Sequence, residues 1–117
     1  MQLSEIQYKT ATPIDGYGPG FFRVAGEALK GSICLTAESA STWGGFDDLQ
    51  VLEKLIGRVD VVLVGTGESM TPIPTPFRNA FETANLGVDP MTSPSACRTF
   101  NVLLAEGRRV AVLLLPV

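Results

Sequence analysis

The 117-residue sequence contains no histidine. Ser-His-Asp triads, Cys-His dyads and the histidine-containing zinc motifs are therefore excluded. The two cysteines, Cys34 and Cys97, stand far apart and form no CxxC pair, which excludes thioredoxin-type motifs and cysteine-rich zinc sites. We expect both to be free thiols in a reducing compartment. The sequence predicts no metal or other cofactor, and it favours binding over catalysis.

Positive charge and long apolar runs are also scarce. Nine Lys and Arg stand against twelve Asp and Glu, giving a net charge of −3, and Arg108-Arg109 is the only basic pair. A nucleic-acid partner would require a basic stripe or cluster, so none is expected. No apolar run approaches the roughly 20 residues of a membrane span, and residues 1–10 lack the apolar region of a signal peptide. We therefore expect a cytoplasmic protein of bacterial type, with no membrane span and no presequence.

The remaining composition is typical of one folded domain. Apolar residues make up 45% of the chain and charged residues 18%, which argues against disorder. A chain of this length is the usual size of a compact domain. Because no repeat or linker divides residues 1–117, we expect a single domain.

The centre of the predicted fold is the aliphatic run at residues 61–64, which leads into Gly65-Thr66-Gly67. A continuous β-branched run that ends in glycine is typical of a strand buried on both faces. Helices and strands alternate from residue 47 onward, which indicates βαβ units and a mixed, partly parallel sheet of the α/β class. The expected helices span 47–56, 75–86 and 93–107, and the other strands of this half span 88–91 and 110–115.

Capping residues support the predicted starts of these helices. Asp47 is the expected N-cap of the first, with Gln50 as its capping-box partner. Thr75 is the expected N-cap of the second, followed by a proline at N1. Thr92 or Ser93 is expected to cap the third.

The N-terminal half carries weaker signals. Residues 21–25 and 32–36 predict a hairpin or meander with a connection at 26–31. Residues 14–20 contain three glycines and one proline and predict a loop, and residues 39–45 predict a polar connector. Trp43 in that connector is either an anchor for the core or an exposed binding residue.

The turn after the central strand is a candidate ligand site. It lacks the third glycine of the dinucleotide fingerprint and the lysine of the P-loop, so the glycines more simply release the chain from the sheet. Nevertheless, the carboxyl ends of strands are the usual ligand site in α/β sheets, and helix N-termini near them favour anions. The candidate ligand-binding residues are Gly65, Thr66, Gly67, Glu68, Arg78, Thr92, Ser93, Arg98 and Asn101.

Several short motifs, in order along nearly the whole chain, carry a family resemblance. They are Gly16-Tyr17-Gly18, Gly31-Ser32-Ile33, Trp43, Asp60-x-x-Leu63-Val64-Gly65-Thr66-Gly67, Thr92-x-x-x-Ala96-x-Arg98-Thr99-Phe100-Asn101-x-Leu103 and Glu106-Gly107-Arg108-Arg109-Val110. The chain resembles a family of small uncharacterised domains that includes mitochondrial complex I assembly factor 3 and the adipogenesis-associated domain protein. The resemblance implies a mixed sheet with helices on one side and a β-hairpin layer on the other. It also implies a role in protein binding or assembly.

Two functional hypotheses follow. The first is a non-catalytic protein-interaction domain that assists assembly of respiratory complex I or another complex, with a complex subunit or another assembly factor as partner. It predicts an exposed apolar patch that includes Tyr17, Trp43 or Pro74. The alternative is a protein that binds a small anionic ligand, or a weak enzyme, in the crevice at residues 65–68, which predicts a concave pocket with convergent polar groups.

Overall fold

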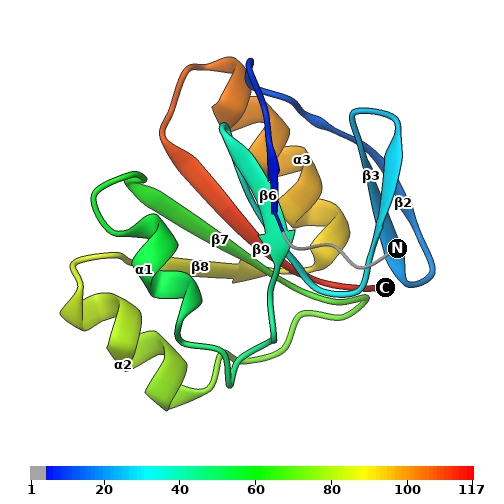
Figure 1. Ribbon diagram of the computed structural model, residues 1–117. Coiled ribbons are helices and arrows are strands. Elements are labelled where there is room, and N and C mark those ends of the chain that lie inside the picture. The colour runs from blue at the N-terminus through cyan, green and yellow to red at the C-terminus, as the bar shows by residue number, and fades with distance from the viewer. Residues whose placement is uncertain (1–4) are drawn as a thin grey trace.

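The computed structural model describes residues 5–117, which form a six-stranded mixed sheet and a separate three-stranded antiparallel sheet (Figure 1). The strand order is β1-β6-β5-β9-β7-β8 in the large sheet and β2-β3-β4 in the small one. The elements are β1 (Glu5–Gln7), β2 (Ile14–Gly18), β3 (Phe21–Val24), β4 (Glu27–Lys30), β5 (Ile33–Thr36), β6 (Ser39–Thr42), α1 (Val51–Leu55), β7 (Val61–Thr66), α2 (Thr75–Thr83), β8 (Val88–Met91), α3 (Ser93–Ala105) and β9 (Val110–Leu115).

The predicted central strand is confirmed as β7, which pairs in parallel with both β8 and β9. Its side chains alternate between two hydrophobic cores. Val62 and Val64 pack with Phe77 of α2, whereas Leu63 packs with Phe100 of α3. This double burial explains the continuous apolar run, because a strand covered on both faces has no side for polar residues.

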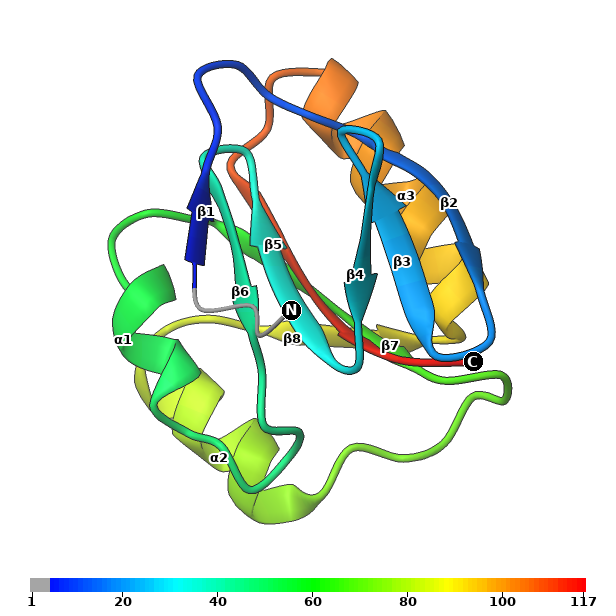
Figure 2. The same cartoon turned by 45° about the vertical axis from the view of Figure 1, so that its right-hand side comes forward.

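The large sheet separates two layers (Figures 1 and 2). Helices α1 and α2 cover one face, while α3 and the small sheet cover the other. The predicted α/β class, mixed sheet and separate β layer are confirmed. Helix α3 lies beside that β layer and contacts β2, so the three helices are divided between the two faces.

The predicted pairing of residues 21–25 with 32–36 is wrong. Residues 27–30 are themselves a strand, β4, which pairs with β3, and β5 belongs to the large sheet between β6 and β9. Ala25 and Gly26 both have positive φ, 52° and 79°, as a two-residue type I′ hairpin turn requires. Such a turn pairs the adjacent segments directly and leaves β5 free to join the other sheet.

Two predicted connectors are also strands. Residues 14–18 form β2, with a register shift between Ile14 and Gly16, and residues 39–42 form β6, which pairs with both β1 and β5. Glycine and serine tolerate extended structure when a neighbouring strand supplies the hydrogen bonds, so composition alone misleads here.

The first two helices are shorter than predicted. Helix α1 covers only residues 51–55, and its N-cap is Gln50. In the turn before it, the Asp48 carboxylate accepts hydrogen bonds from the N–H groups of Gly44 and Gln50 at 2.9 and 3.1 Å. Helix α2 begins at Thr75, so its N-cap is Pro74 rather than Thr75, and it ends before Asn85, whose φ is 62°. The predicted caps at Asp47 and Thr75 are therefore wrong.

Helix α3 follows the prediction most closely. Thr92 is its N-cap, and its Oγ1 accepts a hydrogen bond from the N–H of Ser95 at 3.3 Å. The helix ends at Ala105, and Gly107 follows with a φ of 76°.

Trp43 is an anchor for the core. It is only 2% exposed, and its ring lies 5.5 Å from that of Phe46 and 5.9 Å from that of Phe77. The exposed patch expected from the sequence therefore does not include this ring.

Candidate functional site

The predicted crevice after β7 is a hydrogen-bonded junction. The N–H of Gly67 donates to Ser93 Oγ at 2.9 Å, and the N–H of Ser93 donates to the Gly67 carbonyl at 2.8 Å. Ser93 Oγ donates in turn to the carbonyl of Leu115, at the end of β9. The side chain of Ser93 is fully buried. It therefore ties together the carboxyl ends of β7 and β9 and the start of α3.

Thr66 makes a second set of internal bonds. Its Oγ1 donates to the carbonyls of Ser69 at 2.8 Å and Met91 at 3.2 Å, and it accepts from the N–H of Thr71 at 3.1 Å. Thr66 is 8% exposed. Like Ser93, it has hydrogen-bond partners within the protein, and these hold the loop that follows β7.

The other predicted ligand residues lie apart from one another. Arg78 is on α2 and Arg98 on α3, so the two guanidinium groups come from opposite faces of the sheet (Figure 1). Arg78 lies 3.9 Å from Glu82, and Arg98 donates to Ser95 Oγ at 3.2 Å. The structure thus brings residues 65–67 together with Thr92 and Ser93 but places the two arginines on separate surfaces.

Asn101 holds the small sheet against α3. Its Nδ2 donates to the carbonyl of Ile14 at 2.9 Å, and its Oδ1 accepts from the N–H of Ile14 at 2.8 Å. This side chain satisfies both backbone groups of one residue of β2. Glu68 is exposed at the start of the loop.

A cavity of about 220 Å³ lies at the other end of the central strands, at the amino ends of β7 and β9. Its lining includes Val59, which precedes β7, and Val110, the first residue of β9, together with the buried thiol of Cys34 on β5. Hydroxyl groups of Thr36, Ser39 and Ser41 also line it.

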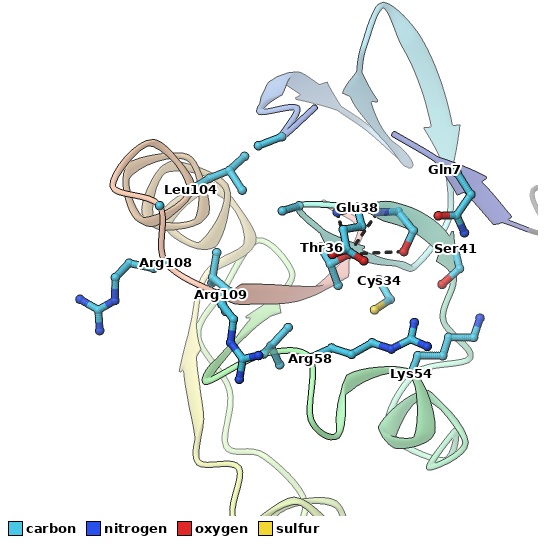
Figure 3. A pocket seen from close by; sticks show the side chains of 16 residues that line it. Gln7, Cys34, Thr36, Glu38, Ser41, Lys54, Arg58, Leu104, Arg108 and Arg109 are labelled. Atoms are coloured by element: carbon cyan, nitrogen blue, oxygen red, sulfur yellow. Dashed lines mark hydrogen bonds between the residues drawn. The ribbon is translucent and has the colours of Figure 1, made fainter. Parts of the chain in front are cut away.

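Positive charge gathers around this cavity (Figure 3). Its lining contains Lys54, Arg58, Arg108 and Arg109, four of the nine basic side chains of an acidic protein. Within the described part of the chain, Glu38 is the only carboxylate in the lining.

Two of these cations have carboxylate partners. Arg109 donates two hydrogen bonds to Asp60, at 2.8 and 3.1 Å, and these bonds hold the pKa of Asp60 below its usual value. The ammonium of Lys54 lies 3.6 Å from Glu5. Within residues 5–117, the guanidinium groups of Arg58 and Arg108 make no hydrogen bond or ion pair, although the charge of Arg108 also acts on Asp60. The cavity therefore carries uncompensated positive charge.

The Cys34 thiol in this cavity is protonated at neutral pH. Burial raises its pKa to about 12, although Lys54 and a hydrogen bond with Ser41 act in the opposite direction. A thiol in this state is a poor nucleophile, and it adds no negative charge to the cavity.

Sequence reasoning missed this cavity because its charged and polar groups come from several separate segments. The adjacent pair Arg108-Arg109 and the four-residue spacing of Lys54 and Arg58 were the available signals. Neither signal shows that the two pairs line the same cavity, since that depends on β9 lying between β5 and β7.

Among residues 5–117, no group of three His, Cys, Asp or Glu side chains is arranged to hold a metal ion.

The family model described as "Protein of unknown function (DUF498/DUF598)" matches residues 14–115. The chain belongs to this DUF498/DUF598 family. An uncharacterized protein of Rhodobacter capsulatus is 48% identical over 99% of this chain and 94% of its own length. The rat NADH dehydrogenase [ubiquinone] 1 alpha subcomplex assembly factor 3 is 27% identical over 99% of this chain. This chain spans 66% of the rat protein's length.

A solved structure agrees with the fold of this DUF498/DUF598 domain. The crystal structure of an outer membrane protein from Bartonella henselae superposes with a TM-score of 0.81 at 33% identity, covering 92% of this chain and 97% of that one. The family resemblance predicted from the sequence is confirmed, and the family includes complex I assembly factors. Within residues 5–117, no helix is long and apolar enough to span a membrane.

Proposed function

We propose that this chain is a non-catalytic protein-interaction domain that assists assembly of a multisubunit complex, and that the complex is NADH:ubiquinone oxidoreductase. The observation that carries the proposal is the match to rat assembly factor 3, which extends over 99% of this chain. A match of this extent relates the whole domain, rather than one motif, to a protein named for assembly.

The state of the thiols argues against cysteine as a nucleophile. Burial raises the pKa of Cys97 to about 11 and that of Cys34 to about 12. Nucleophilic catalysis by cysteine requires the thiolate. At neutral pH both groups are thiols, which suits a structural role in the two cores.

The loop between β7 and α2 is the surface that we assign to the partner. Its start is held by the Thr66 hydroxyl, which bonds Ser69 and Thr71, and its end is held by Ile73, which is only 7% exposed. A loop that is already held loses little conformational entropy on binding. The segment therefore offers a preorganised docking surface.

Apolar groups project from this loop. Met70 is 57% exposed, and Pro74 is also exposed. Methionine is enriched in protein interfaces, where its flexible thioether adapts to a partner. Tyr17, 45% exposed, lies at the same end of the molecule, where the β2–β3 turn meets the C-terminus and the start of the loop (Figure 2).

The proposal is tested in Rhodobacter capsulatus cells that lack the 48% identical relative. We expect the deletion to lower the amount of assembled NADH:ubiquinone oxidoreductase in membranes, measured on native gels and by NADH oxidation, and this chain to restore it. If the deletion leaves assembly unchanged, or if this chain is stably produced and restores nothing, the proposal is wrong.

A pair of surface variants tests the assigned loop in the same cells. We expect Met70→Glu to lose at least about half of the restored enzyme, since a charge at the centre of an interface must be desolvated. Val102→Glu is the matched control, because Val102 on α3 is also 57% exposed. The free energy of unfolding of each variant should lie within about 0.5 kcal/mol of that of the original protein. If the two variants restore equal amounts of the assembled enzyme, the loop is not part of the interface.

A further inference from the structure

The basic cavity is a second surface whose composition needs an explanation. Arg58 and Lys54 enter it from the segment around α1, and Figure 3 shows the Arg58 side chain extending beneath Cys34 toward Lys54. Arg108 points away from Cys34 in the same view. Glu5 lies 3.6 Å from Lys54 and partly compensates it, whereas the guanidinium group of Arg58 has no carboxylate partner within residues 5–117. Like charges in one cavity repel each other, and a bound anion would relieve that repulsion.

We propose that this cavity binds a compact phosphate-type anion, with Arg58 and Lys54 as its principal contacts. A guanidinium group donates two parallel hydrogen bonds to a phosphate, and an ammonium group adds a compact point charge. Ser41, on the same cavity wall, is bonded to the Cys34 thiol, so the charged donors come from Arg58 and Lys54. This site is separate from the Gly65–Ser93 junction, which lies at the carboxyl ends of β7 and β9.

The volume limits the size of the ligand. A cavity of about 220 Å³ is several times the space that a single water molecule requires. Inorganic phosphate, pyrophosphate or the phosphate end of a small monoester fits this space.

The charge balance favours an anion over a neutral ligand. The carboxylates of Asp60 and Glu5 compensate Arg109 and Lys54, but both pairs are exposed and thus screened by solvent. Arg58 has no such partner within the described chain. Among residues 5–117, Glu38 is the only carboxylate that lines the cavity, and the neutral Cys34 thiol adds no charge, although Asp48 and Glu5 act on that thiol from nearby.

Anion binding is independent of the proposed assembly role, because it is measured on the purified protein. The probe is inorganic pyrophosphate, titrated at constant ionic strength and followed by backbone amide NMR shifts. We expect saturable shifts that are largest at residues 34–41 and 54–58. Glycerol 3-phosphate should bind at the same residues, and succinate at matched ionic strength should bind more weakly.

Arg58→Gln is the decisive variant. We expect its dissociation constant for pyrophosphate to rise about tenfold or more, the change expected from losing one charge-assisted hydrogen bond. Arg23→Gln is the matched control, because Arg23 is an exposed arginine of the small sheet that donates to the carbonyl of Gly26. Its affinity should match that of the original protein. Lys54→Gln, on the other side of the cavity, should also weaken binding.

Three outcomes would overturn the proposal. They are the absence of saturable shifts with pyrophosphate, an equal loss of affinity in Arg23→Gln and Arg58→Gln, and tighter binding of succinate than of pyrophosphate. The first denies the site, the second reduces it to general electrostatic attraction, and the third denies the phosphate class. Thermal unfolding of each variant without pyrophosphate verifies that it is folded.

Discussion

Replacing Gly65 with alanine is expected to lower the free energy of unfolding by about 3 kcal/mol, the upper part of the usual range for overpacking. A Cβ at this position would lie 2.7 Å from Ser93 Oγ and 2.8 Å from both Leu114 Cδ2 and the Cα of Ser93. The Ser93 backbone has little freedom to move, because its N–H is bonded to the Gly67 carbonyl. The glycine thus permits the start of α3 to approach β7 closely.

Gly87→Ala is the matched control for this prediction. Gly87 lies between α2 and β8, and a Cβ there would meet no atom within 4 Å. Its replacement should change stability by no more than about 0.5 kcal/mol. Urea unfolding followed by circular dichroism measures both variants. Equal stability of the two would contradict the close packing at the junction.

Raising the pH from 8 to 10 is expected to lower the free energy of unfolding by about 2 kcal/mol through the two buried thiols. The pKa of Cys34 is raised from 9.0 to about 12 and that of Cys97 from 9.0 to about 11, in each case chiefly by burial. Above pH 9, thiols of the unfolded chain lose their protons while those of the folded protein retain them. The unfolded state then binds fewer protons, so stability falls as the pH rises.

The loss should continue to about pH 11 for Cys97 and about pH 12 for Cys34. Cys97 lies nearer to the surface, so it should contribute the smaller part. The test compares unfolding free energies at pH 8 and pH 10 for the original protein and for Cys34→Ala/Cys97→Ala. We expect the double variant to be less stable at pH 8 but to lose less stability on going to pH 10. An identical loss in both proteins would show that the thiols are not the cause.

The fold could be predicted from the sequence where local signals agree. In β7 the apolar run, the β-branched residues and the closing glycine all indicate a buried strand, and in α3 the Thr92 cap and the apolar spacing indicate a helix. The division of residues 14–42 between two sheets was not predictable in this way. Strands β2 to β6 are only four or five residues long, and their partners are decided by the turn at Ala25-Gly26 and by contacts with β9.

The candidate site could be predicted only in part. The proximity of Gly67 and Ser93 follows from the parallel strands, but their hydrogen bonds to each other require the folded geometry. The sequence also does not show which face of the sheet each helix covers, so it could not separate Arg78 from Arg98. The cavity with Arg58 depends on the order of the strands, which is a property of the whole chain.

Cross-linking in living cells tests whether this domain binds a partner during assembly of NADH:ubiquinone oxidoreductase, as we propose. A photoreactive amino acid is placed at position 70 or, as a control, at position 102, in the Rhodobacter capsulatus strain that lacks its relative. We predict a light-dependent adduct from position 70 with a subunit of that enzyme or with another of its assembly factors, identified by mass spectrometry, and none from position 102. The absence of such an adduct while the cells assemble the enzyme, or the same adduct from both positions, would contradict the proposed role in assembly.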